Sequence, residues 1–241
     1  MRPAHPPRAG DTDTALRSPP ATAGACRRRI ARAALAAGCA LLLAACAGGP
    51  PPPDWQANAH AALAGYRAAY LAGNTRLADA EFARARGELA RTGRADQVAR
   101  AELTRCALRP ASLDFDDCPG FAALAADAGD EEAAYAAFLA GRDGAAERLP
   151  AHYRELAASG AAALARIEAP LPRLIAAGVL LRGGKLPAAG VDLAVDTASA
   201  QGWRRPLLAW LAAQARLADE RGDPAAAEHA RRRIALVGGE R

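Results

Sequence analysis

The stretch Trp203–Leu236, which reads WRRPLLAWLAAQARLADERGDPAAAEHARRRIAL, decides the fold that we expect. Its first half carries apolar side chains in steps of three and four, the spacing of one face of an α-helix. Gly222 interrupts this spacing, and Asp223 followed by Pro224 provides an N-cap and a proline at the first position of a second helix. The inward faces consist of Trp203, Leu207, Trp210, Gln214 and Leu217 in the first helix and Ala227, Ala230 and Ile234 in the second. The stretch therefore predicts two helices joined by a tight turn.

A second stretch, Trp55–Thr92, has the same organisation around Gly73 and Asn74. One helical face there consists of Trp55, Ala59, Ala62, Tyr66 and Ala69, and the next of Ala78, Phe82, Ala85 and Leu89. Helical spacing continues between the two stretches, and no segment alternates at the period of two that a half-buried β-strand requires. We therefore predict an all-α fold of roughly ten helices, with residues 54–241 as a single domain.

Four glycines, each expected in a turn between helices, are followed five residues later by an alanine. The pairs are Gly73 and Ala78, Gly141 and Ala146, Gly184 and Ala189, and Gly222 and Ala227. This pattern resembles a degenerate tetratricopeptide repeat, in which a glycine-containing turn joins two helices and small residues let them cross closely. The resemblance implies an α-solenoid of antiparallel helical hairpins. The alternative is a generic alanine-rich array or bundle of hairpins.

A different signal precedes the helical region. Arg27–Arg29 are followed by Ala33–Ala45, an apolar run of 13 residues that is shorter than the roughly 20 residues of a membrane-spanning helix. The run ends in Leu43-Ala44-Ala45-Cys46, and small residues follow. A basic region, a short apolar region and small residues at a cleavage site are typical of a signal peptide. The alternative is a stub of transmembrane helix that stays uncleaved.

The sequence Leu43-Ala44-Ala45-Cys46 resembles the lipobox of bacterial lipoproteins. That resemblance implies that residues 1–45 are removed, that Cys46 carries the lipid, and that residues 46–53 form a Gly/Pro tether. It also implies a location. Because Ala47 and not an aspartate follows the lipidated cysteine, we expect the protein at the periplasmic face of the outer membrane. Attachment would be stable, since such anchors carry several acyl chains.

Removal of residues 1–45 changes the charge of the chain. The full chain has 31 Lys and Arg against 26 Asp and Glu, a net charge of +5. Seven arginines and two aspartates lie in residues 1–45, which leaves 24 basic and 24 acidic residues. The basic excess belongs to the leader, so the net charge gives no reason to expect nucleic acid as a partner.

Two cysteines remain in the helical region, Cys106 and Cys118. An even number of cysteines in an oxidising compartment is typical of disulfide bonding. We expect a disulfide that ties the non-helical connection containing Pro110 to the end of the preceding helix. The alternative is a redox-active or metal-binding pair, which the long spacing and the lack of a nearby histidine disfavour.

Residues with catalytic or cofactor-binding chemistry form no recognisable motif. His60, His152 and His229 belong to no metal-binding spacing, and neither a nucleophile elbow nor a phosphate-binding loop occurs. Asp192 and Asp196 lie four residues apart on one expected helix face and are the only carboxylate pair that we would test as an acid–base site. We therefore expect no cofactor, no metal and no enzymatic activity.

The large aromatic side chains are the remaining candidates for function. Packing in the core is the plainer interpretation for most of them, but one or two could anchor a partner. These candidate interface residues are Trp55, Tyr66, Tyr70, Trp203 and Trp210. Lipoproteins with such repeats act in assembly of the cell envelope, so we expect a non-enzymatic scaffold that is anchored to the membrane by its lipid and binds an envelope protein. The alternatives are a module that binds a small ligand or a cell-wall fragment between its helices and, third, an enzyme.

Overall fold

The computed structural model describes residues 53–142 and 144–239, and every regular element in them is a helix. They form ten α-helices and three short 3₁₀-helices, and no strand occurs in these two ranges. The all-α expectation is therefore confirmed. In chain order the elements are α2 (Asp54–Ala72), α3 (Thr75–Ala90), α4 (Ala95–Ala111), α5 (Pro119–Ala122), η1 (Ala125–Asp127), α6 (Asp130–Leu139), η2 (Ala146–Arg148), α7 (Ala151–Ser159), η3 (Gly160–Arg166), α8 (Pro170–Arg182), α9 (Ala188–Ala200), α10 (Arg204–Glu220) and α11 (Pro224–Gly238).

The described residues all belong to one compact unit. None of the helices in this part of the chain is long and apolar enough to cross a membrane. The sequence Leu43-Ala44-Ala45-Cys46, where we expect the lipid anchor, lies outside the described residues.

Helices α2 and α3 form the hairpin that the sequence predicts. Gly73 ends α2 in the left-handed conformation, with φ of 87°, which glycine adopts without steric cost. The side chain of Asn74 then accepts a hydrogen bond from the backbone N–H of Leu77 and caps α3. All predicted inward residues of α3 are buried, and so are those of α2 except the half-buried Trp55.

Helices α10 and α11 form the second hairpin. Gly222 has a φ of 69°, and the side chain of Asp223 accepts a hydrogen bond of 3.0 Å from the backbone N–H of Ala226. The predicted cap and the proline at the start of α11 are therefore confirmed. Trp210 and Leu211 of α10 are fully buried, so this hairpin supplies much of the core.

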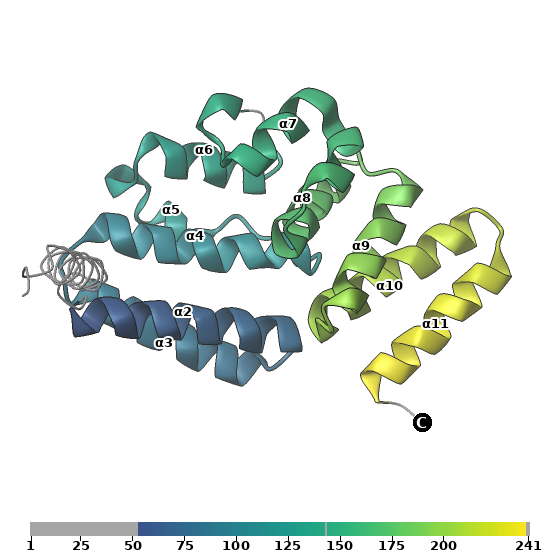
Figure 1. Ribbon diagram of the computed structural model, residues 1–241, viewed down its shortest axis with the longest axis horizontal. Helices are drawn as coiled ribbons and strands as arrows, with labels where there is room; N and C mark the ends of the chain where they lie inside the picture. Colours follow the sequence, from purple (N-terminus) through teal and green to yellow (C-terminus); the bar gives the residue numbers. More distant parts are fainter. Residues whose placement is uncertain (1–52, 143, 240–241) are drawn as a thin grey trace, which may run out of the picture. The chain divides into compact units, whose positions relative to one another are not determined.

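Helix α4 lies between the α2–α3 hairpin and helices α6 and α7 (Figure 1). It contacts α3 on one side and α6 and α8 on the other, and the chain continues from α8 through α9 to α10. Helix α10 in turn contacts α2. Two clusters of buried apolar residues result, one around Tyr66 and Phe82 and one around Trp210, and Leu124, Leu171 and Trp203 pack against both.

The contact between α4 and α8 occurs where the sequence analysis placed a loop. Pro110, expected in a non-helical connection, lies in the last turn of α4, which continues to Ala111. Gly178 of α8 lies against the backbone carbonyl of Pro110, so closely that a Cβ on Gly178 would collide with it. The expected break at Pro110 is corrected: the proline is accommodated in the final turn, and the glycine lets α8 approach it.

The segment between α5 and α8 is less regular than the hairpins. After α7 the chain forms the 3₁₀-helix η3 rather than a further α-helix, because Gly160 interrupts α7 with a φ of 55°. Gly141 and Gly184 have positive φ angles, as the predicted turns require. Only at the two hairpins, however, is the alanine five residues after the glycine buried: Ala78 and Ala227 are, while Ala146 is half-buried and Ala189 is exposed.

Candidate functional site

The predicted disulfide joins Cys106 of α4 to Cys118, the residue before α5. The two Cα atoms are 5.5 Å apart, within the range that a disulfide spans. Asp116 lies beside the two sulfur atoms. Its carboxylate accepts a hydrogen bond from the backbone N–H of Cys118 and pairs with Arg109 at 3.2 Å. With both sulfurs bonded to each other and the carboxylate engaged by the loop, this cluster is structural.

Three of the five candidate interface residues are core residues. Trp210 is 0% exposed, Tyr66 2% and Tyr70 8%. Their rings leave no surface for a partner, which corrects the interface role suggested for them. Trp55 and Trp203 are half-buried and pack against the cluster around Tyr66, so these two remain candidates.

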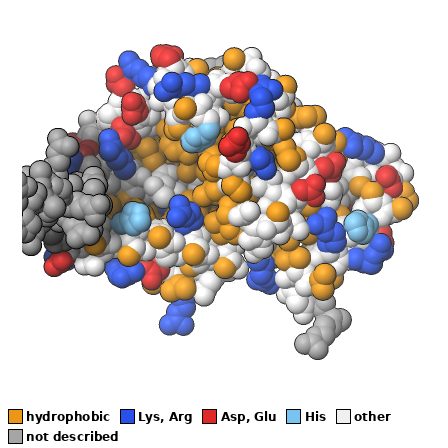
Figure 2. All heavy atoms as spheres, viewed as in Figure 1, with side chains coloured by type: hydrophobic (Ala, Val, Ile, Leu, Met, Phe, Trp, Pro, Cys, Tyr) orange, Lys and Arg blue, Asp and Glu red, His pale blue; other side chains and the backbone are white. Residues whose placement is uncertain are grey.

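A cleft along α4 opens between several helices in the described part of the molecule. Its volume is about 430 Å³. Figure 2 shows this face hollowed, with apolar side chains at the bottom of the hollow and charged ones along its borders. We call it the α4 cleft; it is lined by Arg67, Arg100, Leu103, Thr104, Ala107, Leu108, Glu131, Glu132, Tyr135, Arg148, Leu149, Pro150, Arg154, Leu171 and Ile175.

The floor of the α4 cleft is apolar. Leu103, Ala107 and Leu108 lie on one face of α4, and Leu171 and Ile175 on α8 close the bottom. Helical spacing puts the α4 residues on one stripe, which is why a single helix can line the length of the floor. Leu103, Ala107 and Ile175 belong to the cluster around Trp210, and Leu108 belongs to the cluster around Tyr66. Leu171 packs against both clusters, so the cleft lies where they meet.

Tyr135 of α6 adds an aromatic wall. Its ring stacks on that of Tyr153, with centroids 5.9 Å apart. Burial raises the pKa of Tyr135 to about 12, since the charged phenolate would be poorly solvated there. The phenol therefore stays neutral well into the alkaline range, and its ring forms an uncharged wall of the cleft.

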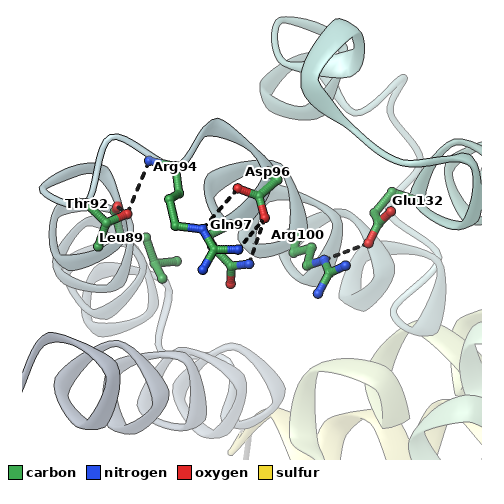
Figure 3. Close-up of polar contacts among 7 residues, drawn as sticks. All are labelled: Leu89, Thr92, Arg94, Asp96, Gln97, Arg100 and Glu132. Carbon is green, nitrogen blue, oxygen red and sulfur yellow. Dashed lines mark hydrogen bonds and ion pairs between the residues drawn. The ribbon is translucent and has the colours of Figure 1, made fainter. Parts of the chain in front are cut away.

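The rim of the α4 cleft carries four arginines and two glutamates. Two of the arginines are held in ion pairs. The Arg100 Nε donates to Glu132 Oε1 at 2.6 Å and thereby connects α4 to α6 (Figure 3). Arg148 pairs with Asp130 at 2.5 Å.

The other two arginines of the rim lie on opposite walls. Arg67, on α2, is exposed and makes no ion pair or side-chain hydrogen bond to another described residue. Arg154, on α7, donates from Nε to the backbone carbonyl of Leu149 at 2.9 Å. Neither Nη atom of Arg154 makes a hydrogen bond or an ion pair with a residue that the structure describes. The cleft therefore combines an apolar floor with guanidinium groups whose donors are not used by other described residues, an arrangement suited to binding an anionic group.

The polar residues that the sequence analysis considered for catalysis do not meet. His60, His152 and His229 are exposed on α2, α7 and α11, and the histidines of Figure 2 form separate patches. Asp192 and Asp196 are exposed on α9, and Asp192 accepts a hydrogen bond of 2.7 Å from Gln214. Within residues 53–142 and 144–239, no carboxylate lies in one cleft with a histidine in an arrangement that suggests acid–base chemistry.

No protein-family model matches this chain, and no curated protein or solved structure matches it either. The function is therefore inferred from the residues and the geometry of this chain alone.

The residues of the α4 cleft were not identified by the sequence analysis. Ala99, Leu103 and Cys106 have the helical spacing of an ordinary inward face, which does not distinguish a cleft from the core. Arg67 and Arg154 resemble many other exposed arginines on alanine-rich helices, and nothing in the sequence shows that α2 and α7 face each other across α4. Only the tertiary structure brings Arg67 and Arg154 into one cleft.

Proposed function

We propose that this chain is a bacterial lipoprotein whose helical domain is held at the periplasmic face of the outer membrane by a lipid on Cys46. The residues Leu43-Ala44-Ala45-Cys46 and the basic and apolar segments before them support the anchor. The disulfide between Cys106 and Cys118 fits an oxidising compartment such as the periplasm.

The hairpins support a repeat architecture related to tetratricopeptide repeats. Each of α2–α3 and α10–α11 turns at a glycine with positive φ, and in each a buried alanine lies five residues further on. Small residues at such crossings let helices approach closely. The intervening helices would then be divergent members of the same hairpin array.

Within this framework the domain is a non-enzymatic scaffold that holds a segment of an envelope protein in the α4 cleft. The observation that carries this proposal is the cleft itself, an open apolar floor bordered by guanidinium groups. Peptide-binding grooves on helical domains use the same combination, with apolar anchors for affinity and polar groups at the rim for orientation.

The second candidate function is binding of a small ligand or a cell-wall fragment. The volume of the α4 cleft, about 430 Å³, favours it, since pockets for small molecules span about 300–1,000 Å³. Both functions place the occupant in the α4 cleft. They differ in the occupant, which is a protein segment in the first and a small molecule in the second, and photo-crosslinking from the cleft distinguishes the two.

The anchor is tested by metabolic labelling with an alkyne-bearing fatty acid. The wild-type chain should be labelled and the Cys46→Ser variant should not, and mass spectrometry should identify a diacylated peptide that begins at Cys46. A labelled Cys46→Ser chain would refute the lipid anchor.

The scaffold is tested by photo-crosslinking in living cells. A photoreactive amino acid in place of Thr104, which lines the α4 cleft, should capture a specific envelope protein. The matched control is the same amino acid at Arg76, an exposed position on α3 that does not line the cleft. Equal capture from both positions, or none from Thr104, would refute the scaffold.

A further inference from the structure

From the charges around the α4 cleft we infer the chemistry of its occupant, an inference that rests on the proposed scaffold function. We propose that the cleft binds a short segment of a partner protein in which an acidic side chain is flanked by apolar residues. The carboxylate is received by Arg154 and Arg67, and the apolar residues cover the floor formed by α4 and α8.

The four arginines of the rim differ in whether they form ion pairs. Arg100 and Arg148 are neutralised by Glu132 and Asp130, so they contribute little field to the cleft. Among the described residues, the only acidic group of the rim that makes no ion pair is Glu131, and its single negative charge offsets one of the two remaining positive charges. Arg67 and Arg154 thus leave a local excess of positive charge on the two walls, which is complementary to an anion.

Arg154 is the better organised of the two. Its bond to the Leu149 carbonyl, at 2.9 Å, uses Nε and fixes the guanidinium against the wall of the cleft. The two Nη atoms retain their donors, and the planar group can present them side by side to a carboxylate. Because the side chain is already held, less conformational entropy is lost on binding.

The floor defines what accompanies the carboxylate. The lining residues of α4 extend from Arg100 to Leu108, a rise of roughly 12 Å for eight residues. An extended peptide covers that length with roughly four residues. The large aliphatic residues of the floor are Leu103, Leu108, Leu171 and Ile175. Leu171 is half-buried and the other three are buried, so apolar side chains next to the acid would bury surface mainly against Leu171 and the half-buried ring of Tyr135.

The experiment uses three peptides that differ in one residue. The lipidated protein that begins at Cys46, held in nanodiscs, is titrated with acetyl-Leu-Glu-Leu-Phe-amide, with its Gln counterpart and with its Lys counterpart, each carrying an uncharged fluorophore. We expect the Glu peptide to bind at least about tenfold more tightly than the Gln peptide, since charge-assisted hydrogen bonds contribute more than neutral ones. The Lys peptide should bind most weakly.

Variants then assign the carboxylate to its arginines. Arg154→Gln should remove most of the difference between the Glu and Gln peptides, Arg154→Lys should keep part of it, and Arg67→Gln should reduce it. Arg76→Gln is the matched control, because Arg76 is also exposed but does not line the cleft, and it should change nothing. Circular dichroism of each variant verifies that the fold is retained.

Equal binding of the Glu and Gln peptides, or an unchanged preference in the Arg67→Gln/Arg154→Gln double variant, would overturn the inference. The crosslinking from position 104 keeps that failure distinct from failure of the scaffold function. If a partner is captured there but the captured peptide lacks an acidic residue, the scaffold survives and the acidic segment does not. If lipid or a cell-wall fragment is captured instead, both fall.

Discussion

Gly178 of α8 faces the backbone carbonyl of Pro110 in the last turn of α4, and no side chain separates the two helices at this point. The neighbouring residues Ala176 and Ala177 are fully buried as well. Helix α8 thus approaches the end of α4 at Gly178. Because both helices supply the floor of the α4 cleft, this approach sets the depth of the candidate site.

The first prediction concerns that approach. Gly178→Ala should destabilise the protein by about 1–3 kcal/mol, the usual effect of adding atoms to a closely packed contact, because a Cβ collides with a backbone carbonyl that cannot rotate away. Chemical denaturation of both proteins measures this difference in the free energy of unfolding.

Gly87→Ala is the matched control for Gly178→Ala. Gly87 is also in a helix, α3, but a Cβ there meets nothing within 4 Å. Alanine is the better helix former, so this variant should gain about 0.5–1 kcal/mol of stability. Equal effects of the two variants would show that propensity and not the helix contact determines the cost.

Trp210 carries the second prediction. Its indole Nε1 donates to the backbone carbonyl of Ala111 at 3.0 Å, which satisfies one of the acceptors left open at the end of α4. Trp210→Ala should lower the free energy of unfolding by about 3–5 kcal/mol. Trp210→Phe keeps an aromatic ring but leaves the buried carbonyl without its donor, which should cost about 1–3 kcal/mol.

Trp55 provides the comparison for Trp210, because it is half-buried at the start of α2. Trp55→Phe should change the unfolding free energy by less than about 1 kcal/mol. If Trp210→Phe is as mild as Trp55→Phe, the hydrogen bond to Ala111 contributes nothing measurable.

The elements that the sequence could predict are those specified by local signals. Gly73, Asn74, Gly222 and Asp223 act on the residues next to them, so both hairpin turns were predicted in place. Pro110 was misassigned because a proline usually ends a helix, whereas here the final turn tolerates it beside Gly178.

The candidate site depends on relationships that no local signal encodes. Arg205 of α10 donates to the carbonyl of Tyr70 at 2.7 Å and lies over its ring, 4.4 Å from the centroid. These residues are 135 positions apart. The contact between α10 and α2, like the presence of Arg67 and Arg154 in one cleft, follows from packing of the whole unit, and the spacing of residues in the sequence does not predict it.

The third prediction concerns the disulfide. Reduction, or the double variant Cys106→Ala/Cys118→Ala, should lower the free energy of unfolding by about 2–4 kcal/mol, as expected for closure of a short loop. Thermal unfolding with and without reductant measures it. The double variant should not respond to reductant, and a response there would place the effect at another cysteine.

The fourth prediction is a loss of stability in alkaline solution. Burial raises the pKa of Tyr135 to about 12 and also raises the pKa values of Tyr66, Tyr70 and Tyr153, whereas the same side chains titrate near 10 in an unfolded chain. The folded state therefore favours the protonated phenols. Their contribution to stability is complete below about pH 10 and is lost as the pH rises through the folded-state pKa of about 12 for Tyr135.

The urea midpoint should accordingly stay level between about pH 8 and 9 and fall between about pH 10 and 12. Absorbance at the tyrosinate band, recorded in parallel, should show these tyrosines ionising later than free tyrosine or only on unfolding. Tyr135→Phe should make the fall with pH shallower, because its ring no longer titrates. A midpoint that is independent of pH up to about 12 would mean that the phenols ionise in the folded protein as they do in the unfolded chain, and that Tyr135 beside the α4 cleft is in contact with water.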